Sequence, residues 1–187
     1  MAYHPSPDAA RRRYETHNNQ PNDPDYQAFF QPLLQALLAK SSAPAQVLDY
    51  GSGSGSPLPF MLKGLGYEVA VYDPLFKPDS GPLAGTYDIV TCTETMEHFG
   101  EAGAEMRKAL DLLKPRGILA LMSLWLQESQ DFHTWWYKND PTHISFYSPR
   151  TLAWMAQAWN LELQILGTRM AFFISGSRPA EGGPRLD

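Results

Sequence analysis

A short stretch near the middle of the N-terminal half has residue types and spacing suited to binding a small ligand. It reads Gln46-Val47-Leu48-Asp49-Tyr50-Gly51-Ser52-Gly53-Ser54-Gly55-Ser56-Pro57. The apolar pair before Asp49 predicts a buried strand, and Ser56 with Pro57 predicts a helix start. Glycines let a ligand lie against the backbone and allow turns that other residues resist. Strand, glycine turn and helix N-terminus together predict the ligand-binding corner of a doubly wound α/β fold.

The spacing of the loop indicates which ligand it binds. A dinucleotide loop needs a third glycine at position 56, where this chain has Ser56, and no Lys-Ser/Thr pair follows as a P-loop requires. Asp49 would repel a pyrophosphate but suits a cationic ligand. Asp73 follows the next apolar run at about the distance where a carboxylate meets a ribose diol. A ribose-bearing cation without phosphates is therefore expected, and S-adenosylmethionine fits that description.

A second group of polar residues follows the predicted strand 87–93. Glu94, Glu97 and His98 lie within five positions, and His143 precedes the last predicted helix. Mixed carboxylate and imidazole groups suit Mg²⁺, Mn²⁺ or a similar divalent ion. The same residue types also suit proton transfer without a metal, with His98 as the base. A purely structural role, in which these side chains hydrogen-bond within the core, is the third possibility.

The surrounding periodicity predicts the elements that position these residues. Strands are expected around Val47, at 68–72, 87–93 and 118–124, and in a closing antiparallel hairpin at 161–166 and 169–175. Helices are expected from Tyr26 to Leu38, where Pro32 implies a kink or two shorter helices, and at 58–65, 100–113 and after Ser148-Pro149. The expected fold is a doubly wound, mostly parallel Rossmann-like α/β sheet with a reversed edge strand.

The segment after Asp73 departs from a regular alternation of strands and helices. Residues 74–86 contain Pro78, Gly81, Pro82 and Gly85 and show no good strand pattern. We therefore expect the third strand region to be shortened and the sheet to be smaller there. Leu75 and Phe76 are the nearest candidates to cover an adenine ring, although a core role suits either equally well.

Four features in this order resemble the class I S-adenosylmethionine-dependent methyltransferases. They are the loop 49–55, the pair Asp73-Pro74, the strand 87–92 and the turn 113–117. The resemblance covers roughly residues 46 to 175 and is nearest to a small bacterial branch related to the ubiquinone-pathway O-methyltransferases. Arg116 stands where the family usually has a second glycine, which affects only a surface turn.

The resemblance implies an S-adenosyl-L-methionine-dependent methyltransferase and assigns roles to individual residues. Its cofactor-binding residues would be Asp49, Gly51, Ser52, Gly53, Gly55, Asp73, Pro74, Thr93 and Glu94. The ubiquinone-pathway and small-RNA 2′-O-methyltransferases have a metal site that would correspond here to Glu94, Glu97, His98 and His143. A cation held there would bind the acceptor hydroxyl and lower its pKa. Without a metal, His98 and Glu94 are the catalytic candidates.

Two further segments are candidates to contact the methyl acceptor. The polar N-terminal extension, residues 1–23, is either a floppy tail or a lid over the cofactor, with Tyr14 and His17 as the residues that would contact substrate. Trp135, Trp136 and His143 lie in an aromatic segment that commonly forms the acceptor wall in this fold. The alternative is that these aromatic side chains only fill the gap left by the shortened sheet.

Composition restricts the remaining possibilities. The 187 residues allow one domain, expected at 24–175, and residues 176–187 are expected to be a disordered tail. One cysteine suits the cytoplasm, and no segment predicts a membrane span or a secretory signal. A net charge of −5 favours a small-molecule acceptor over nucleic acid. A catalytically silent binding protein and a nicotinamide oxidoreductase on the same fold are the alternatives. The acceptor, the methylated atom and the oligomeric state are not readable.

Overall fold

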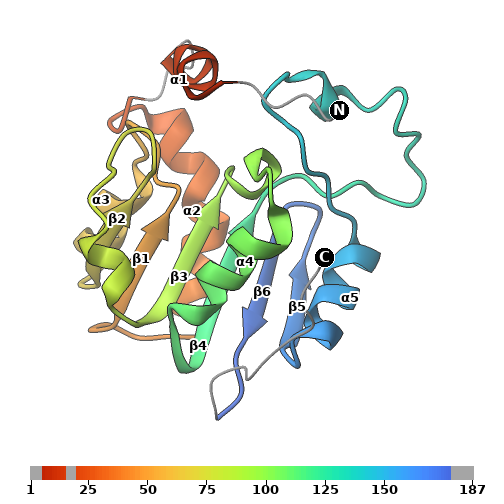
Figure 1. Cartoon of the computed structure of the whole chain (residues 1–187). Helices are drawn as coiled ribbons and strands as arrows, with labels where there is room; N and C mark the ends of the chain where they lie inside the picture. The colour runs from red at the N-terminus through yellow and green to blue at the C-terminus, as the bar shows by residue number, and fades with distance from the viewer. Residues whose placement is uncertain (1–5, 16–19, 178–187) are drawn as a thin grey trace.

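A six-stranded sheet forms the centre of the computed structural model, which describes residues 6–15 and 20–177 (Figure 1). The strand order is β2-β1-β3-β4-β6-β5. The strands are β1 (Gln46–Tyr50), β2 (Glu68–Tyr72), β3 (Tyr87–Thr93), β4 (Leu113–Met122), β5 (Glu162–Leu166) and β6 (Met170–Ile174). Neighbours from β2 to β4 are parallel, and β6 runs antiparallel to both β4 and β5. The predicted Rossmann-like sheet, with its reversed strand in the closing hairpin, is confirmed.

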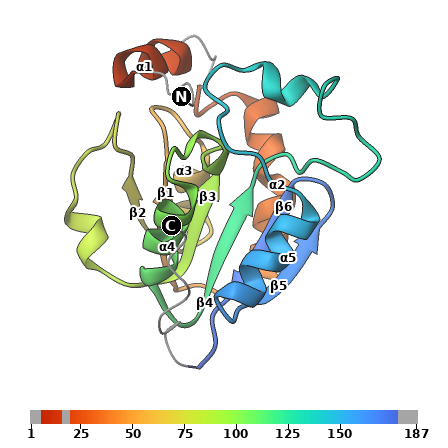
Figure 2. The ribbon, with the colours of Figure 1, turned by 45° about the vertical axis from the view of Figure 1, so that its right-hand side comes forward.

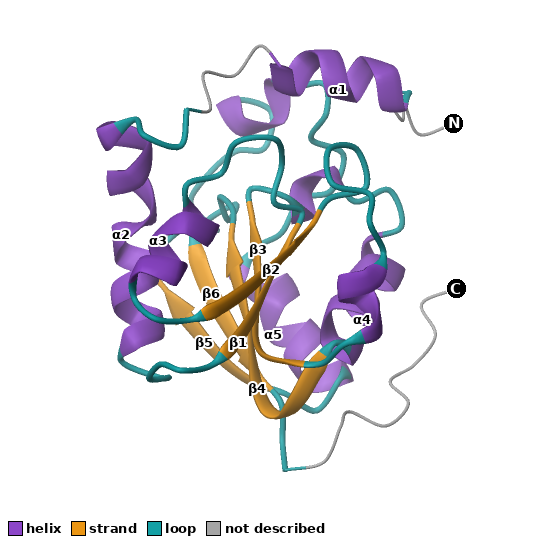
Figure 3. Ribbon diagram, turned by 90° about the vertical axis from the view of Figure 1, so that its left-hand side faces the viewer, coloured by secondary structure: helices purple, strands orange, loops and turns teal. Residues whose placement is uncertain are grey.

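Helices cover both faces of the sheet, as a doubly wound fold requires. They are α1 (Pro7–Glu15), α2 (Pro24–Leu38), α3 (Leu58–Gly64), α4 (Ala102–Asp111) and α5 (Pro149–Ala158). Figure 3 shows α2 and α3 on one face and α4 and α5 on the other, and α5 packs against β5 in Figure 2. Each face buries its own apolar cluster, one around Leu33 and Val47, the other around Trp125 and Leu121. The helix α1 lies across the end of the sheet at which β1 and β3 terminate.

Side chains cap the N-termini of α2 and α5, and the cap of α3 lies one residue from its predicted position. The Asp23 carboxylate accepts hydrogen bonds from two backbone amides of α2, and Ser148 caps α5 by accepting from the amide of Thr151. The α3 helix begins at Leu58, as the predicted range 58–65 has it, but its N-cap is Pro57 and not the predicted Ser56, which still accepts a hydrogen bond from the Leu58 amide. Pro32 lies inside a single α2 helix, so the expectation of two shorter helices was wrong.

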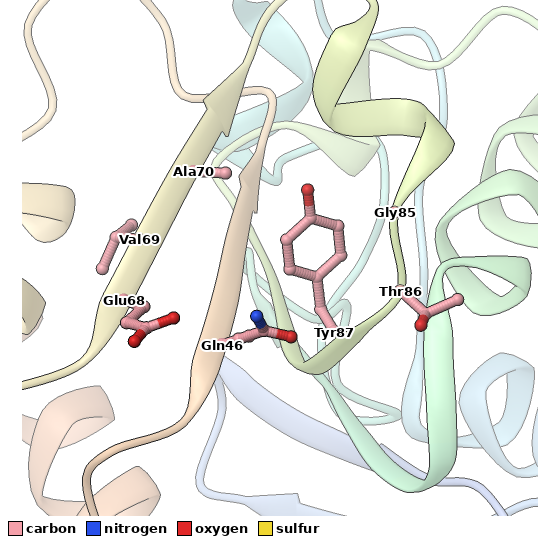
Figure 4. Close-up of a pocket in the computed structure, with 7 residues that line it drawn as sticks. All are labelled: Gln46, Glu68, Val69, Ala70, Gly85, Thr86 and Tyr87. Carbon is pink, nitrogen blue, oxygen red and sulfur yellow. The ribbon is translucent and has the colours of Figure 1, made fainter.

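The expected loss of a strand after β2 is confirmed among the described residues. Between β2 and β3 the chain forms only an isolated bridge from Asp73 to Lys77 and the 3₁₀ turn η1 (Gly81–Ala84). The strand β2 is therefore an edge. An open cavity of about 470 Å³ lies over the starts of β2, β1 and β3, lined by Glu68 of β2, Gln46 of β1 and Tyr87 of β3 (Figure 4).

Residues 113–117, which the sequence predicts as a turn, form the irregular first part of β4. The pairing of β3 with β4 jumps from Tyr87–Leu113 to Ile89–Ile118, so the intervening residues of β4 bulge out of register. Arg116 has a φ of +62°, which glycine adopts without strain and arginine does not. A Cβ atom on Gly117 would lie 2.8 Å from the carbonyl oxygen of Lys114, so this position requires glycine.

Candidate active site

A cavity of about 1040 Å³ lies at the carboxyl ends of β1, β2 and β3. Its walls come from the glycine loop 51–56, from residues 72–76 after β2 and from residues 93–101 after β3. The remaining walls are Tyr14 of α1, the start of α2, and the segment Thr142–Ile144. Ligands bind at this edge of open α/β sheets because the loops after parallel strands converge there. The sequence analysis placed the site at the same three strand ends.

The glycine loop is held against β2 and leaves its surface free for a ligand. The amides of Gly51 and Ser52 both donate to the carbonyl oxygen of Tyr72, at 2.8 and 3.1 Å. Gly51 and Gly53 have φ values of +79° and +61°, in the left-handed region that glycine favours. A Cβ atom on Gly51 would lie 2.1 Å from the Thr95 side chain, whose hydroxyl donates to the Gly51 carbonyl. The loop conformation therefore depends on glycine at position 51 at least.

The Asp73 carboxylate joins the glycine loop to the segment after β2. One oxygen accepts a hydrogen bond from the Gly53 amide at 2.9 Å, and the other accepts from the amides of Leu75 and Phe76. Asp73, Pro74, Leu75 and Phe76 all line the cavity. This carboxylate is thus fixed by backbone amides at the cavity wall, where a ribose diol could replace the Gly53 contact.

Asp49 is completely buried behind the loop and is not among the residues that line the cavity. One carboxylate oxygen accepts a hydrogen bond from the Thr91 hydroxyl at 2.7 Å, and the other has no partner among the described residues. Burial raises the pKa of Asp49 to about 6, against the opposing effects of Thr91 and the Lys77 charge. A buried carboxylate oxygen without a partner suits a cationic ligand group, although contact would require the loop to shift.

Glu94 stands at the cavity wall in an unusual backbone conformation. Its φ is +47°, which is uncommon for a residue with a Cβ atom and concentrates at functional sites. The carboxylate makes only long contacts, 3.4 Å to the Tyr137 hydroxyl and 3.5 Å to a guanidinium nitrogen of Arg169. Burial and the nearby Glu97 carboxylate raise the pKa of Glu94. Glu94 therefore retains hydrogen-bonding capacity toward the cavity. Thr93 also lines it.

Glu97 differs from Glu94 because its hydrogen bonds are already made within the protein. It is 1% exposed, and its carboxylate accepts hydrogen bonds from Tyr137 at 2.5 Å and from Ser123 at 3.1 Å. Its backbone carbonyl accepts from the amides of Ile144 and Ser145. Glu97 therefore ties the segment between β4 and α5 to the end of β3.

His98 and His143 each direct the ring nitrogen Nδ1 at a backbone carbonyl oxygen. Nδ1 of His98 lies 2.9 Å from the carbonyl oxygen of Thr142, and Nδ1 of His143 lies 2.7 Å from that of Tyr137. Because a carbonyl only accepts, each Nδ1 carries a proton and each neutral ring keeps a lone pair on Nε2. The ring centroids are 5.0 Å apart. One ligand atom from each of Glu97, His98 and His143 falls within 4.8 Å of the others, and Glu94 is outside this group.

The helix α1 contributes the ring of Tyr14 to the cavity wall. That ring meets His98 edge-on at 5.1 Å and Phe76 at 6.2 Å. Arg13 donates to the Asp140 carboxylate at 2.8 Å, which joins α1 to the segment between β4 and α5. The N-terminal residues that the structure describes thus lie over the cavity. The predicted contact residue His17 falls outside the described residues.

Neither tryptophan proposed for the acceptor wall lines the cavity among the described residues. Trp135 is buried against Phe132, Tyr137 and Phe146, and Trp136 is 62% exposed. The structure places these two side chains away from the cavity wall, because the aromatic segment packs mostly on itself, and their contact with substrate stays a prediction. Tyr137 was not singled out from the sequence, yet its hydroxyl contacts both Glu94 and Glu97. Only its place among other aromatic residues pointed to it.

Comparison with known proteins also indicates a methyltransferase. A methyltransferase-domain family model matches residues 23–165. The fold resembles the 1,6-didemethyltoxoflavin N1-methyltransferase of Burkholderia thailandensis, at 17% identity and a TM-score of 0.61, over 94% of this chain and 93% of that one. It also resembles the magnesium protoporphyrin IX methyltransferase of Synechocystis (17% identity, TM-score 0.58, 91% and 92% covered). A protein from Pyrococcus horikoshii gives 13% identity and a TM-score of 0.58, with 89% and 99% covered.

The chain belongs to the methyltransferase-domain family, because the family model matches well over half of its length. The prediction of a methyltransferase is confirmed by this family match and holds over the two alternatives. The structural neighbours support the fold alone, since they are under 25% identical. No curated protein matches the chain. Among the described residues, no helix has the length and apolar character needed to cross a membrane.

Proposed function

We propose that the cavity binds S-adenosylmethionine and that the protein transfers its methyl group to a small molecule. The observation that carries this proposal is the meeting of the left-handed glycine loop with the fixed Asp73 carboxylate at one cavity wall. The glycine backbone would approach the methionine part of the cofactor, and Asp73 would hold the ribose hydroxyls. Pro74, Leu75 and Phe76 line the wall next to Asp73 and would cover the adenine.

The cofactor's ammonium group is proposed to lie toward Asp49. The unpartnered carboxylate oxygen of this buried residue supports the assignment, since an ammonium group would supply the missing donor. Ser52 and Gly55 would contact the amino-acid part, and Thr93 would face the centre of the cofactor, near the sulfonium. Methyl transfer is a single displacement on an activated carbon, so alignment of nucleophile, methyl and sulfur is the main task of the protein.

The acceptor is proposed to enter between α1 and the segment 142–144. Tyr14 of α1 and His143 would contact it, and α1 would act as a lid that excludes water. A small molecule is supported by the covered cavity and by the two neighbours whose names state small-molecule substrates. His98 would take a proton from the acceptor through Nε2, since its Nδ1 lies 2.9 Å from the carbonyl oxygen of Thr142.

A divalent cation is a second candidate participant at Glu97, His98 and His143. Their ligand atoms lie within 4.8 Å of one another. Both histidines also donate Nδ1–H to backbone carbonyls, as metal-binding histidines commonly do. A cation bound there would lower the pKa of an acceptor hydroxyl. The relation to the ubiquinone-pathway O-methyltransferases and the cytoplasmic location remain proposals from the sequence.

The proposed cofactor site is tested by calorimetric titration with S-adenosylhomocysteine. We expect micromolar binding, and we expect Asp73→Asn to weaken it by more than tenfold, because the substitution removes the charge that holds the Gly53, Leu75 and Phe76 amides. Asp79→Asn is the matched control, since Asp79 is an exposed turn residue that also accepts from a backbone amide. Unchanged affinity in Asp73→Asn would remove the ribose assignment. Repeating the titration with chelator and then with Mg²⁺ or Mn²⁺ tests the metal.

A further inference from the structure

The cavity wall is rich in hydrogen-bond acceptors and negative charge. Six of the described residues that line it carry carboxyl groups, and the one lysine, Lys108, is already paired with Glu105 at 2.5 Å. Asp73 is assigned above to the ribose, and Glu101 and Glu105 lie at the α4 end. Glu97 is committed to Tyr137 and Ser123. Glu94 and Asp25 remain on the side of the cavity formed by α2.

Glu94 is a cavity-wall carboxylate whose partners among the described residues are the Tyr137 hydroxyl and the Arg169 guanidinium. Its two contacts within the protein are 3.4 and 3.5 Å long, so they are weak compared with the short bonds of Glu97. It also lies outside the group of atoms that suit a metal. The guanidinium of Arg169 approaches Glu94 but also sits over the Phe29 ring at 5.7 Å, so it is shared with the cavity's aromatic wall.

Aromatic rings line the same cavity, and the Phe29 ring lies near Glu94 because Arg169 contacts both. Tyr14 comes from α1, and Tyr26, Phe29 and Phe30 come from α2. Aromatic faces beside a carboxylate attract cations, since the ring quadrupole and the negative charge act in the same direction. His98 and His143 add imidazole rings whose Nδ1 atoms each lie against a backbone carbonyl oxygen. The chamber thus offers acceptors and aromatic faces, and an anionic acceptor molecule would meet like charges there.

We propose that the methyl acceptor is a small molecule bearing a basic amine, and that the Glu94 carboxylate binds its ammonium group against the rings of Tyr26 and Phe29. This inference rests on the proposed methyltransferase function and specifies the substrate class of the same cavity. Glu94 then acts in acceptor recognition, which separates it from the cofactor-binding and metal-binding roles that its sequence position suggested. Phosphorylated or carboxylated acceptors are expected to bind more weakly, because they would meet these carboxyl groups.

The test compares three probes that share a phenylalkyl skeleton and differ in charge. Phenethylamine is cationic, phenethyl alcohol is neutral and hydrocinnamate is anionic at neutral pH. Each is titrated at up to millimolar concentration into protein saturated with S-adenosylhomocysteine, with binding followed by ligand-observed NMR. We expect the amine to bind about tenfold more tightly than the alcohol, as one charge-assisted hydrogen bond supports, and the carboxylate to bind most weakly.

Glu94→Gln keeps the size of the side chain and removes the carboxyl group that can ionise beside a bound ammonium group. We expect it to weaken amine binding about tenfold. Binding of the alcohol and of S-adenosylhomocysteine should stay within about twofold. Glu68→Gln is the matched control, since Glu68 lies in the separate cavity of Figure 4. It should alter none of these affinities.

Two kinds of result would overturn the inference. One is a chamber that binds the alcohol or the carboxylate as well as the amine, or binds no amine at all. The other is a Glu94→Gln variant that loses S-adenosylhomocysteine as strongly as amine, which would return Glu94 to the cofactor site. Failure of the wild-type protein to bind S-adenosylhomocysteine is a separate result that contradicts the proposed function itself.

Discussion

At the scale of single residues, the site depends on carboxylates that are chemically alike but differ in their surroundings. Asp73 is held by three backbone amides, Glu97 by two hydroxyls, and Glu94 by long contacts only. Asp49 has one oxygen without any partner. A carboxylate that is satisfied within the protein stabilises structure, and one that is not is available to a ligand. This difference separates structural from ligand-binding candidates more clearly than residue type does.

Asp49 should make stability depend on pH in a predictable direction. Burial raises its pKa in the folded protein to about 6 from 3.8, so the folded state holds this proton more tightly than the unfolded chain does. The contribution of Asp49 to the free energy of unfolding therefore falls as pH rises from about 4 to about 6, by at most about 3 kcal/mol. Asp49→Asn should remove that fall. The free energy of unfolding of the variant, relative to that of wild type, should therefore rise as pH rises.

Denaturant unfolding of wild type and Asp49→Asn at pH 4 and pH 7 measures the contribution of Asp49 to the free energy of unfolding. The other titrating groups are the same in both proteins, so their effects cancel in the comparison. Equal pH dependence in the two proteins would contradict the buried carboxylate. The same substitution should weaken S-adenosylhomocysteine binding, since the proposed partner of the ammonium group loses its charge.

At the scale of elements, the irregular start of β4 contains a residue in a strained conformation. Arg116 is exposed with a φ of +62°, and its backbone amide donates to the Gly176 carbonyl. Arg116→Gly keeps that hydrogen bond and relieves the strain, although it also raises the entropy of the unfolded chain. We expect a gain of about 0.5–1 kcal/mol in the free energy of unfolding, measured by denaturant titration.

Gly117→Ala is the opposing variant at the neighbouring position. Its methyl group would lie 2.8 Å from the Lys114 carbonyl oxygen and 3.2 Å from that of Asp88, so the backbone of β4 would have to shift. We expect a loss of more than about 1 kcal/mol. If both substitutions changed stability in the same direction, the account of this bulge would be wrong.

At the scale of the whole molecule, the cavity is closed by segments that are far apart in the chain. The helix α1 lies over the strand ends, and the pair Arg13–Asp140 joins it to the segment before α5. Asp140 also accepts from the amide and the hydroxyl of Thr142, a cavity-wall residue. Burial by itself would raise the pKa of Asp140, but the hydrogen bonds from Thr142 and Arg13 lower it to about 2, so it stays charged at neutral pH.

Weakening this ion pair should release bound cofactor faster. We expect Arg13→Gln to increase the dissociation rate of S-adenosylhomocysteine about two- to fivefold, the effect of one partly exposed ion pair. Stopped-flow displacement measures that rate. Arg12→Gln is the control, because the neighbouring Arg12 is exposed on the same helix. High salt should reduce the difference between wild type and Arg13→Gln. Equal rates at low salt would show that α1 does not hold the cavity closed.

The sequence by itself determined the strands, the glycine loop and the shortened edge of the sheet. These features arise from local properties: β3 from a run of mostly β-branched residues, the loop from glycines at 51 and 53, and the missing strand from the prolines and glycines of 74–86. Their signals come from neighbours in the chain, so no distant contact was needed to recognise them.

Tertiary structure alone decided what the polar residues of the site do. Glu94 and Glu97 follow the same strand, yet only Glu97 receives hydrogen bonds from Ser123 and a short one from Tyr137, residues 26 and 40 positions away. Arg13 meets Asp140 across 127 positions and brings Tyr14 over the cavity. Burial and pairing depend on which distant side chains arrive, and no local pattern carries that information. For the same reason the sequence did not indicate that Trp135 is buried, that Trp136 is exposed, or that Tyr137 contacts both glutamates.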